Sequence, residues 1–269
     1  MRLLLQRLND NMKLFCVSDL HSFYTPLKKA LDLAGFDTNN KNHWLISCGD
    51  ALDRGPESEE VLHYLMSLER KILVKGNHDL LLEDLCMREF PYSYDFSNGS
   101  VKTVNDIGGA GEGYPFDKCC ENTLNRTAAY RDLLINYFET ENYIFVHSWI
   151  PLKCSDNLPK YYLKNRQLDY DPDWRYADES AWELAMWGNP FEHAKNGFNK
   201  TGKTIVFGHW HCSCGWSKEE GRSEFDTDAR WDPYINKDQK IVGIDACTVH
   251  TGKVNVLVIE DNFITKEGV

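Results

Sequence analysis

The stretch HWLISCGDALDRG, residues 43–55, joins a short apolar run to a turn that is crowded with charge. Asp50 and Asp53 stand three residues apart, Arg54 follows directly, and a glycine closes the turn at each end. Short apolar runs that stop abruptly at polar residues are typical of buried strands. Charges packed this closely either repel or pair. The stretch therefore predicts a buried strand whose end carries charged groups for a specific purpose.

The composition limits the kind of protein that this chain can be. It has 269 residues, of which 42% are hydrophobic and 26% charged, which suits one large globular domain or at most two. The net charge of -11 disfavours unspecific binding to nucleic acid or to an anionic membrane. Since no apolar run approaches the roughly 18 residues of a membrane span, we expect neither nucleic acid nor membrane as a partner.

The cysteines indicate the redox environment. There are nine, an odd number, and Cys16, Cys48 and Cys247 lie in apolar, strand-like runs. This pattern predicts free thiols in a reducing cytoplasm. The CSC sequence at 212–214 is tighter than the usual spacing of a zinc pair, so ordinary side chains are favoured there over a metal site.

The chain repeats one local pattern, in which a short apolar run ends in polar residues and a helical pattern usually follows. The runs are KLFCVS, HWLISC, KILVKG, YIFV and KTIVFG. Such alternation predicts an α/β fold, with buried sheets covered by helices. Helices are expected within residues 26–35, 56–71 and 124–140. Residues 240–260 are expected to form two strands joined at HTGK.

Two regions, residues 90–125 and 151–200, fit this pattern poorly. We interpret both as excursions that border the functional site, within a single domain over residues 12–262. Residues 1–11 are expected to be an N-terminal extension. The aromatic residues of the second excursion, Trp174, Trp182 and Trp187, are expected to form the core of a small cap, in preference to a platform for base stacking.

Polar side chains stand where the five runs end. They are Asp19, His21, Asp50, Asn77, His147 and His209. Ligands of open α/β sheets gather outside the carboxyl ends of the strands. Carboxylate, imidazole and amide groups are ligands of divalent metal ions. One such residue alone would indicate a cap or a turn, but six at consecutive strand ends predict a metal site.

Six sequence blocks carry a resemblance to a known family. They are DLH (19–21), GDALDRG (49–55), GNHD (76–79), FVHSWI (145–150), GHWH (208–211) and GIDACTVHTGKVNVLVIE (243–260). Together they resemble the calcineurin-like metallophosphoesterases, and most of all the phosphoprotein phosphatase branch. That branch includes small bacterial and phage serine/threonine phosphatases and the diadenosine tetraphosphate hydrolases. The blocks follow the family order from Met12 to Glu260, and their joint occurrence is highly specific.

The resemblance implies a four-layer α/β/β/α sandwich of two mixed sheets, with a dinuclear metal site at the strand ends. Asp19 and His21 would bind the first ion, Asp50 would bridge both ions, and three further residues would complete the second site. Those three are Asn77, His147 and His209. The ions are expected to be manganese, with iron, zinc, cobalt and nickel as alternatives.

The implied chemistry is hydrolysis by a water that two ions activate together. Two divalent ions about 3.5–4 Å apart can share a carboxylate, acidify a water and clamp a phosphoryl group. Arg54 and Asn77 would contact the phosphate, since a guanidinium suits phosphate oxygens. The alternative for Arg54 is a surface ion pair with Glu57. The resemblance also implies that His78 is the general acid for the leaving oxygen and that Asp53 orients it.

His211, in GHWH, is a further predicted ligand. The phosphatase branch usually has proline at this position, whereas the wider family has a histidine that binds the first ion. Two residues beyond a strand end can point the same way, so His209 and His211 could face neighbouring ions with Trp210 turned away. A structural role for His211 is the alternative.

The sequence departs from the phosphatase pattern at other positions. Ser22 stands where glycine is usual, and Asp79 stands where glutamate is common. The segment MWGNP has a tryptophan but lacks the second phosphate-binding arginine, for which Arg166 and Arg175 are candidates. The P-loop-like GFNKTGKT is not expected to bind phosphate, because a strand follows it instead of a helix.

The sequence thus predicts a metal-dependent phosphomonoesterase of the serine/threonine protein phosphatase type, acting on a phosphorylated protein or a small phosphate ester. The alternative is a dinucleoside polyphosphate hydrolase, or another phosphodiesterase, on the same core. A non-catalytic scaffold is a third interpretation, and it would predict lost ligands.

Overall fold

The computed structural model describes residues 12–109, 111, 114–154 and 168–261. The proposed N-terminal extension, residues 1–11, and the candidate Arg166 lie outside the described residues.

Five strands form the first sheet, in the order β12-β1-β2-β3-β4. They are β12 (Leu257–Asp261), β1 (Met12–Val17), β2 (His43–Cys48), β3 (Lys71–Val74) and β4 (Leu134–Ile135). The strands β1 to β4 run parallel, and β12 is antiparallel to β1 at one edge. Parallel pairing brings the carboxyl ends of β1, β2 and β3 to the same edge of the sheet, as the repeated sequence pattern predicts.

Five further strands form the second sheet, in the order β10-β11-β9-β6-β5. They are β10 (Tyr234–Asn236), β11 (Ile241–Gly243), β9 (Thr204–Phe207), β6 (Tyr143–Phe145) and β5 (Phe138–Glu139). The central strands β11, β9 and β6 are parallel, while β10 and β5 are antiparallel to their neighbours. Both sheets are therefore mixed, which confirms the predicted sheet type.

The two sheets pack face to face through a buried apolar layer. On β1, Leu14 and Cys16 belong to this layer, together with Phe145 and Val206 of the opposite sheet. The alternate residues of β1, Phe15 and Val17, belong to the core under the helices. Side chains of a strand alternate between its two faces, so a strand that is apolar throughout must be covered on both.

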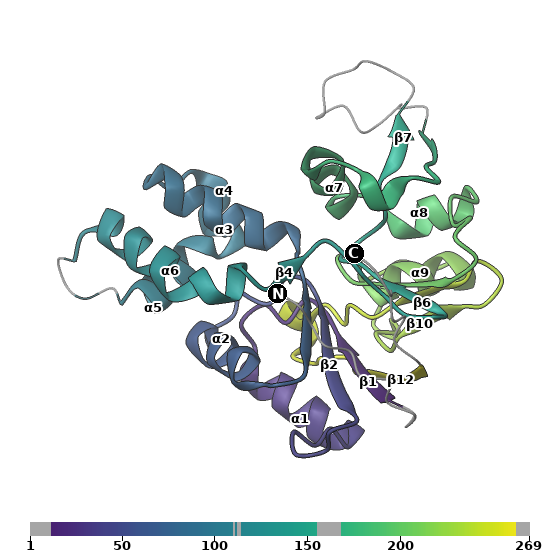
Figure 1. The fold of residues 1–269 in the computed structure, drawn as a ribbon, viewed down its shortest axis with the longest axis horizontal. Helices are drawn as coiled ribbons and strands as arrows, with labels where there is room; N and C mark the ends of the chain where they lie inside the picture. The colour runs from purple at the N-terminus through teal and green to yellow at the C-terminus, as the bar shows by residue number, and fades with distance from the viewer. Residues whose placement is uncertain (1–11, 110, 112–113, 155–167, 262–269) are drawn as a thin grey trace.

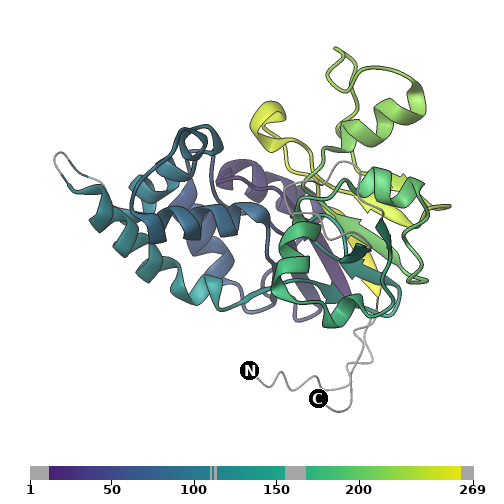
Figure 2. The same cartoon turned by 90° about the horizontal axis from the view of Figure 1, so that it is seen from above.

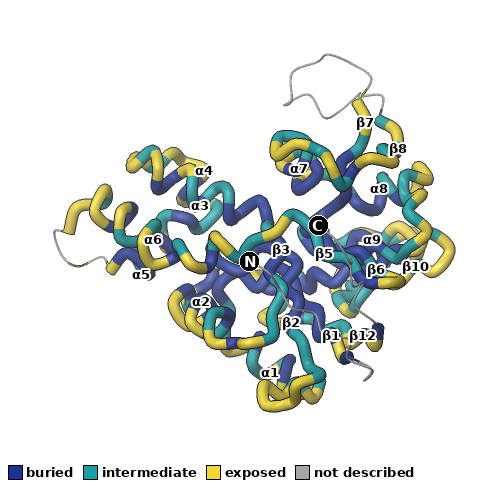
Figure 3. Tube along the Cα trace, in the orientation of Figure 1, coloured by how far each residue is buried: buried dark blue, intermediate teal, exposed yellow. Residues whose placement is uncertain are grey.

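Helices cover the outer face of each sheet (Figure 1). The first group is α1 (Tyr24–Ala34), α2 (Ser58–Ser67), α3 (Asn77–Arg88), α5 (Ser100–Gly108) and α6 (Phe116–Arg131). The second group is α7 (Glu179–Met186), α8 (Pro190–Lys195) and α9 (Cys212–Glu220). Figure 2 shows the two groups on opposite sides, and Figure 3 shows that burial concentrates in the strands between them. The predicted α/β/β/α sandwich is confirmed.

The two excursions add helices to these outer layers. The first forms α4 (Ser93–Asn98), α5 and the start of α6, and the second forms α7, α8 and smaller elements. Those smaller elements are β7 (Leu152–Cys154), β8 (Leu168–Tyr170) and a 3-10 turn over Trp174–Tyr176. Trp174 and Trp182 are buried, as expected for core, but Trp187 is 45% exposed. The assignment of Trp187 to a cap core was therefore wrong. The single domain over residues 12–262 stays a prediction.

Two predicted elements are wrong. The helix expected over residues 124–140 ends at Arg131, because the residues after it form β4 and β5 and pair with β3 and β6. The strands expected over residues 240–260 form no hairpin. They are β11 and β12, which belong to different sheets and are separated by the short helix α10 (Thr248–Thr251). β4, β11 and β12 each pair with a strand that is distant in sequence, and this pairing overrides the local pattern, whereas β5 forms a hairpin with the nearby β6.

Candidate metal centre

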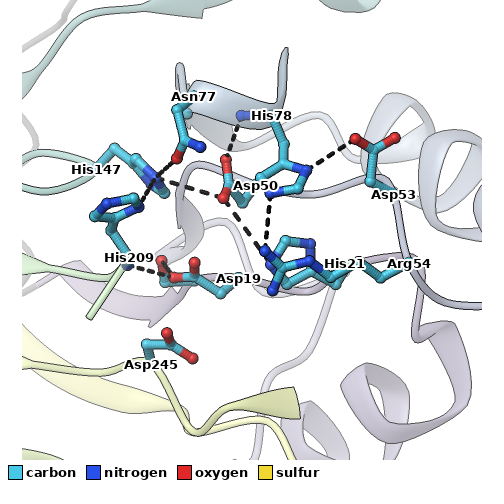
Figure 4. Close-up of polar contacts among 12 residues, drawn as sticks. Asp19, His21, Asp50, Asp53, Arg54, Asn77, His78, His147, His209 and Asp245 are labelled. Atoms are coloured by element: carbon cyan, nitrogen blue, oxygen red, sulfur yellow. Dashed lines mark hydrogen bonds and ion pairs between the residues drawn. The ribbon is translucent and has the colours of Figure 1, made fainter. Parts of the chain in front are cut away.

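The predicted ligands meet at one place, between the carboxyl ends of strands from both sheets (Figure 4). Asp19 and Asp50 follow β1 and β2, Asn77 opens α3 after β3, and the histidines follow β6 and β9. Those histidines are His147 and His209. All five residues except His209 are almost fully buried. The structure therefore brings together the residues that the strand-end pattern singled out.

The backbone around the centre is unusual. Asp19, Asp50 and His209 all have positive φ angles, of 51°, 52° and 62°. Residues other than glycine rarely adopt such angles, and they cluster where a site imposes them. Glycine also permits a close approach, since a Cβ on Gly76 would lie 2.1 Å from Oδ1 of Asp50. Two neighbouring loops can therefore meet around the Asp50 carboxylate.

Asp50 stands between histidines of the two sheets. Its Oδ2 lies 3.9 Å from Nε2 of His21 and 3.5 Å from Nε2 of His147. Its Oδ1 accepts a hydrogen bond of 3.0 Å from the backbone N–H of His78. Burial raises the pKa of Asp50, but the surrounding histidines, His147 foremost, lower it by more, so the carboxylate stays ionised. One oxygen of an ionised carboxylate thus faces two imidazoles at once, as a bridging ligand would.

The hydrogen bonds of the histidines leave ligand atoms facing inward. Nδ1 of His21 lies 3.1 Å from the carbonyl of Leu52, and Nδ1 of His147 lies 2.9 Å from the carbonyl of Cys48. A carbonyl only accepts, so each Nδ1 carries a proton, and Nε2 is the ring nitrogen that faces Asp50. This arrangement, in which one ring nitrogen donates outward and the other points inward, is usual for metal-binding histidines.

Atoms that can accept hydrogen bonds also gather around His147, next to Asp50. Nε2 of His147 lies 2.7 Å from Oδ1 of Asn77 and 3.2 Å from Nδ1 of His209. Burial and the neighbouring His147 lower the pKa of His209 to about 3, so His209 is neutral at pH 7. With a neutral His147, these atoms would present lone pairs to one another, which costs free energy unless a cation lies among them. The donor set therefore fits a divalent ion.

Two groups of candidate ligands share Asp50. One is His21, Asp50 and His78, the other is Asp50, His147 and His209, and in each the ligand atoms lie within 4.8 Å of one another. Asp19 lines the same cavity, where its Oδ2 accepts hydrogen bonds from the Ser18 hydroxyl and, at 2.8 Å, from the N–H of His209. The shared member is the residue that the sequence predicts as the bridge.

His78 is close enough to be a ligand, but both of its ring nitrogens have other partners. Nδ1 lies 2.8 Å from Oδ2 of Asp53, and Nε2 lies 3.0 Å from Nη2 of Arg54. Burial lowers the pKa of His78, but Asp50 and Asp53 raise it by more, so the net direction is upward. A histidine that a buried carboxylate holds in place, beside a guanidinium, can move a proton to an oxygen leaving from this cavity.

Arg54 does not form the surface pair that was its alternative interpretation. Glu57 instead accepts hydrogen bonds from the backbone N–H and the hydroxyl of Thr25. Arg54 lines the cavity of about 140 Å³ that also contains Asp19 and His21. Its guanidinium is therefore placed where a phosphate held at the centre could be bound.

His211 also lines this cavity, at the start of α9. Its Nδ1 lies 2.7 Å from Oε1 of Glu224, which leaves Nε2 toward Asp245, 4.0 Å from Oδ2. The neighbouring Trp210 lines a different cavity, so it is turned away as predicted. The geometry leaves both alternatives for His211 open, and its ligand role stays a prediction.

Of the two candidates for a second phosphate-binding arginine, Arg175 lies in the described residues, and it lies away from the metal centre. Nε and Nη2 of Arg175 lie 2.8 Å and 2.9 Å from the carboxylate of Glu139, and the guanidinium stacks on Trp174. Arg175 lines a cavity with Lys75 that contains none of the predicted ligands. It therefore does not supply the phosphate contact that MWGNP lacks.

The two departures from the phosphatase pattern have local explanations. Ser22 adopts a φ of 59°, a left-handed conformation that explains why glycine is usual there. Asp79 accepts hydrogen bonds of 2.8 Å from the N–H of Gly76 and 2.9 Å from the hydroxyl of Tyr130. Burial raises the pKa of Asp79 to about 6. Asp79 thus fixes the start of α3, the helix that carries Asn77 and His78.

Sequence reasoning missed two residues of the site. Asp245 is buried, lines the cavity, and accepts a hydrogen bond of 2.7 Å from the N–H of Cys247. Burial and the charge of Asp19 raise the pKa of Asp245 well above its usual range. Trp187 lines the same cavity, and its ring lies edge-on to His209 at 5.8 Å. Asp245 follows the apolar run IVGI, so the strand-end pattern could have found it, and the place of Trp187 in the segment MWGNP was the signal that could have distinguished it from its buried neighbours.

The fold and the centre define a metallophosphoesterase. The family described as calcineurin-like phosphoesterase matches residues 12–213, and the chain belongs to that family. That family is described as one of phosphoesterases, and it uses divalent metal ions. No helix in the described part of the chain combines the length and the apolar character needed to cross a bilayer.

The curated relatives are similar over a limited stretch. A symmetrical bis(5'-nucleosyl)-tetraphosphatase of Pseudomonas fluorescens is 46% identical over 72 residues, which is 26% of this chain and 25% of the relative. The enzyme of the same name from Aeromonas salmonicida is 46% identical over 67 residues, 24% of each chain. The chain thus matches about a quarter of the length of these relatives.

Solved structures share the fold at low sequence identity. A cold-active protein tyrosine phosphatase aligns with a TM-score of 0.52 and 14% identity, over 93% of this chain and 74% of the other. The cold-active protein-tyrosine phosphatase of a Shewanella species aligns with a TM-score of 0.50 and 13% identity, over 94% and 76%. These likenesses bear on the fold alone.

Proposed function

We propose that this chain hydrolyses phosphate esters at a two-ion centre bridged by Asp50. The observation that carries the proposal is the single Asp50 oxygen that faces inward-pointing imidazole nitrogens from both sheets. The first ion would be held by Asp19, His21 and Asp50, with His211 as a further ligand. The second would be held by Asp50 and a set from β3, β6 and β9, namely Asn77, His147 and His209.

Divalent ions bound there would acidify a water and draw charge from a phosphoryl group, and we propose manganese as the ion. The chain's own residues do the rest. Arg54 and Asn77 bind and orient the phosphate, and the guanidinium fork favours in-line placement. His78 gives a proton to the leaving oxygen, and Asp53 orients the ring and favours its protonated form.

As substrate we propose a phosphomonoester, of the kind that serine/threonine protein phosphatases hydrolyse. The second candidate, a dinucleoside polyphosphate, is favoured by the names of the relatives that are 46% identical over part of the chain. A non-catalytic scaffold is disfavoured, because every predicted ligand is present in the sequence. The odd number of cysteines, nine, supports a reducing compartment, and we propose the cytoplasm.

A substrate panel tests the proposal. The manganese-loaded protein would be assayed with p-nitrophenyl phosphate, phosphoserine peptides and diadenosine tetraphosphate, each compared by kcat/KM. Hydrolysis of the monoesters supports the main proposal, and a clear preference for the dinucleotide supports the second candidate. No hydrolysis of any member, with both ions bound, would contradict the function.

A further inference from the structure

The cavity of the metal centre offers a phosphate one arginine. Among the described residues that line this cavity, Arg54 is the only lysine or arginine. The segment MWGNP lacks the second arginine of the phosphatase pattern, and Arg175 lines another cavity, where it pairs with Glu139. Apart from the histidines, any further side-chain contact to a phosphate must therefore come from an uncharged donor.

Few lining residues can supply such a donor. Besides the predicted ligands, the neutral side chains of the cavity that carry an N–H, O–H or S–H are those of Asn98, Trp187, Cys247 and Thr248. The Thr248 hydroxyl is shielded from solvent, so a ligand in the cavity does not reach it. A thiol is only a weak donor, which disfavours Cys247. Asn98 and Trp187 therefore remain.

The amide of Asn98 is free to donate. Asn98 is the last residue of α4 and is half-buried. Within the described part of the chain, its side chain has no hydrogen-bond partner. A carboxamide carries two N–H donors, whereas the indole of Trp187 carries one. A donor that faces an anionic oxygen makes a charge-assisted hydrogen bond, which is stronger than a bond between neutral groups.

The two residues that follow Asn98 are held against the catalytic groups. Gly99 has a φ of 83°, and a Cβ at this position would lie 2.2 Å from the backbone nitrogen of Arg54. The Ser100 hydroxyl donates a hydrogen bond of 2.6 Å to Oδ2 of Asp53. Because both neighbours are fixed in this way, the backbone of Asn98 has a set position beside Arg54. A donor that is held in place before the ligand arrives loses less entropy on binding.

From these features we infer that Asn98 is a phosphate-contact residue, whose amide donates to an oxygen of the phosphoryl group that Arg54 binds. Arg54 lies next to His78 at the centre (Figure 4). The inference rests on the proposed function and deepens it, because the contact that MWGNP lacks comes from the first excursion instead. Removal of one donor to a charged group weakens binding about tenfold or more.

Calorimetry with inorganic phosphate tests the contact without catalysis. The manganese-loaded wild type would be compared with Asn98→Ala and Asn98→Asp. Asn98→Ala should bind phosphate about tenfold more weakly, and Asn98→Asp more weakly still, because it places an anion at the same position. Asn105→Ala is the matched control, since Asn105 lies on α5 and does not line the cavity, and its phosphate affinity should equal that of the wild type. Unchanged affinity in Asn98→Ala, or no phosphate binding by the wild type, would overturn the inference.

Kinetics separate a phosphate contact from a structural role. Asn98→Ala should raise KM about tenfold and leave kcat unchanged, because the contact is made equally with the bound substrate and in the transition state. The increase should be the same for p-nitrophenyl phosphate and phosphoserine, which share the phosphoryl group, and the melting temperature should match that of the wild type. A fall in kcat at unchanged KM would show that Asn98 only positions other groups. An effect on one substrate alone would place it at the leaving group. Either result would overturn the contact.

Two further outcomes bear on the inference. Trp187→Phe removes the competing N–H and keeps an aromatic ring, so it should weaken phosphate binding less than Asn98→Ala does. A larger effect in Trp187→Phe would assign the contact to Trp187 and overturn the inference. If the wild type hydrolyses no substrate, the proposed function fails, and the calorimetry with phosphate still decides whether Asn98 contacts the anion.

Discussion

Replacing Asp53 with asparagine tests how His78 is kept ready to donate a proton. Asp53 is fully buried, and its Oδ2 lies 2.8 Å from Nδ1 of His78. Burial lowers the pKa of His78, and the charges of Asp50 and Asp53 raise it above the usual range. Asp53→Asn removes one of those two charges and keeps the size of the side chain, so the pKa of His78 falls.

The magnitude follows from the loss of the negative charge on the acceptor of this hydrogen bond. A hydrogen bond to a charged group contributes about 1.5–3 kcal/mol, which corresponds to about 10- to 150-fold in rate. The acid is active below its pKa and loses its proton as the pH rises through that pKa. The alkaline limb of the pH–rate profile should therefore move to lower pH in the variant. Phosphoserine, whose alkoxide leaves poorly, should be slowed by this factor, and p-nitrophenyl phosphate by less.

The assay is kcat against pH for both substrates, with manganese saturating. Ser100→Ala is the matched control, because the Ser100 hydroxyl donates to the same Oδ2 of Asp53 at 2.6 Å. It removes a neutral partner and leaves the charge beside His78, so its alkaline limb should stay in place. An unmoved limb in Asp53→Asn, or equal slowing of both substrates, would refute the role of the pair.

Three further changes test other parts of the account. Arg54→Lys replaces a fork with a point charge, so inorganic phosphate should inhibit about tenfold less strongly, and an unchanged inhibition constant would count against a phosphate contact. His211→Ala should weaken one ion selectively, so that activity returns at high manganese, whereas unchanged affinity for both ions in calorimetry would make His211 structural. Ile46→Ala opens a cavity between the sheets and should lower the free energy of unfolding by about 2–5 kcal/mol in urea, and a loss below about 0.5 kcal/mol would contradict the burial of this side chain.

Much of the centre could be predicted because its signal is local. The ligands follow apolar runs. A polar residue directly after a buried strand indicates either a ligand site or a turn. A glycine precedes Asp50, Asn77 and His209, and Gly76 leaves room for the Asp50 carboxylate. Parallel pairing then brings these strand ends together without further information from the sequence.

The errors arose where distant pairing decides the structure. Residues 134–139 carry a helical pattern, but β4 pairs with the distant β3, which no local window can reveal, and β5 pairs with the nearby β6. Asp245 was not recognised because residues 240–260 were expected to form a hairpin. A residue within a hairpin does not lie at the carboxyl end of a parallel strand, where the ligands were sought. Trp182 lies within α7 and is buried, whereas Trp187 stands just after the end of α7 and is exposed, a difference that depends on packing.

The measurement that tests the central claim most directly is the metal content of the wild type and of Asp50→Asn. Asparagine keeps the size of Asp50 but removes the charge between the two imidazole groups. We predict two manganese ions per chain in the wild type and fewer than two in the variant, with nearly all activity lost and the circular dichroism spectrum unchanged. Two tightly bound ions and normal turnover in Asp50→Asn would contradict the bridged centre.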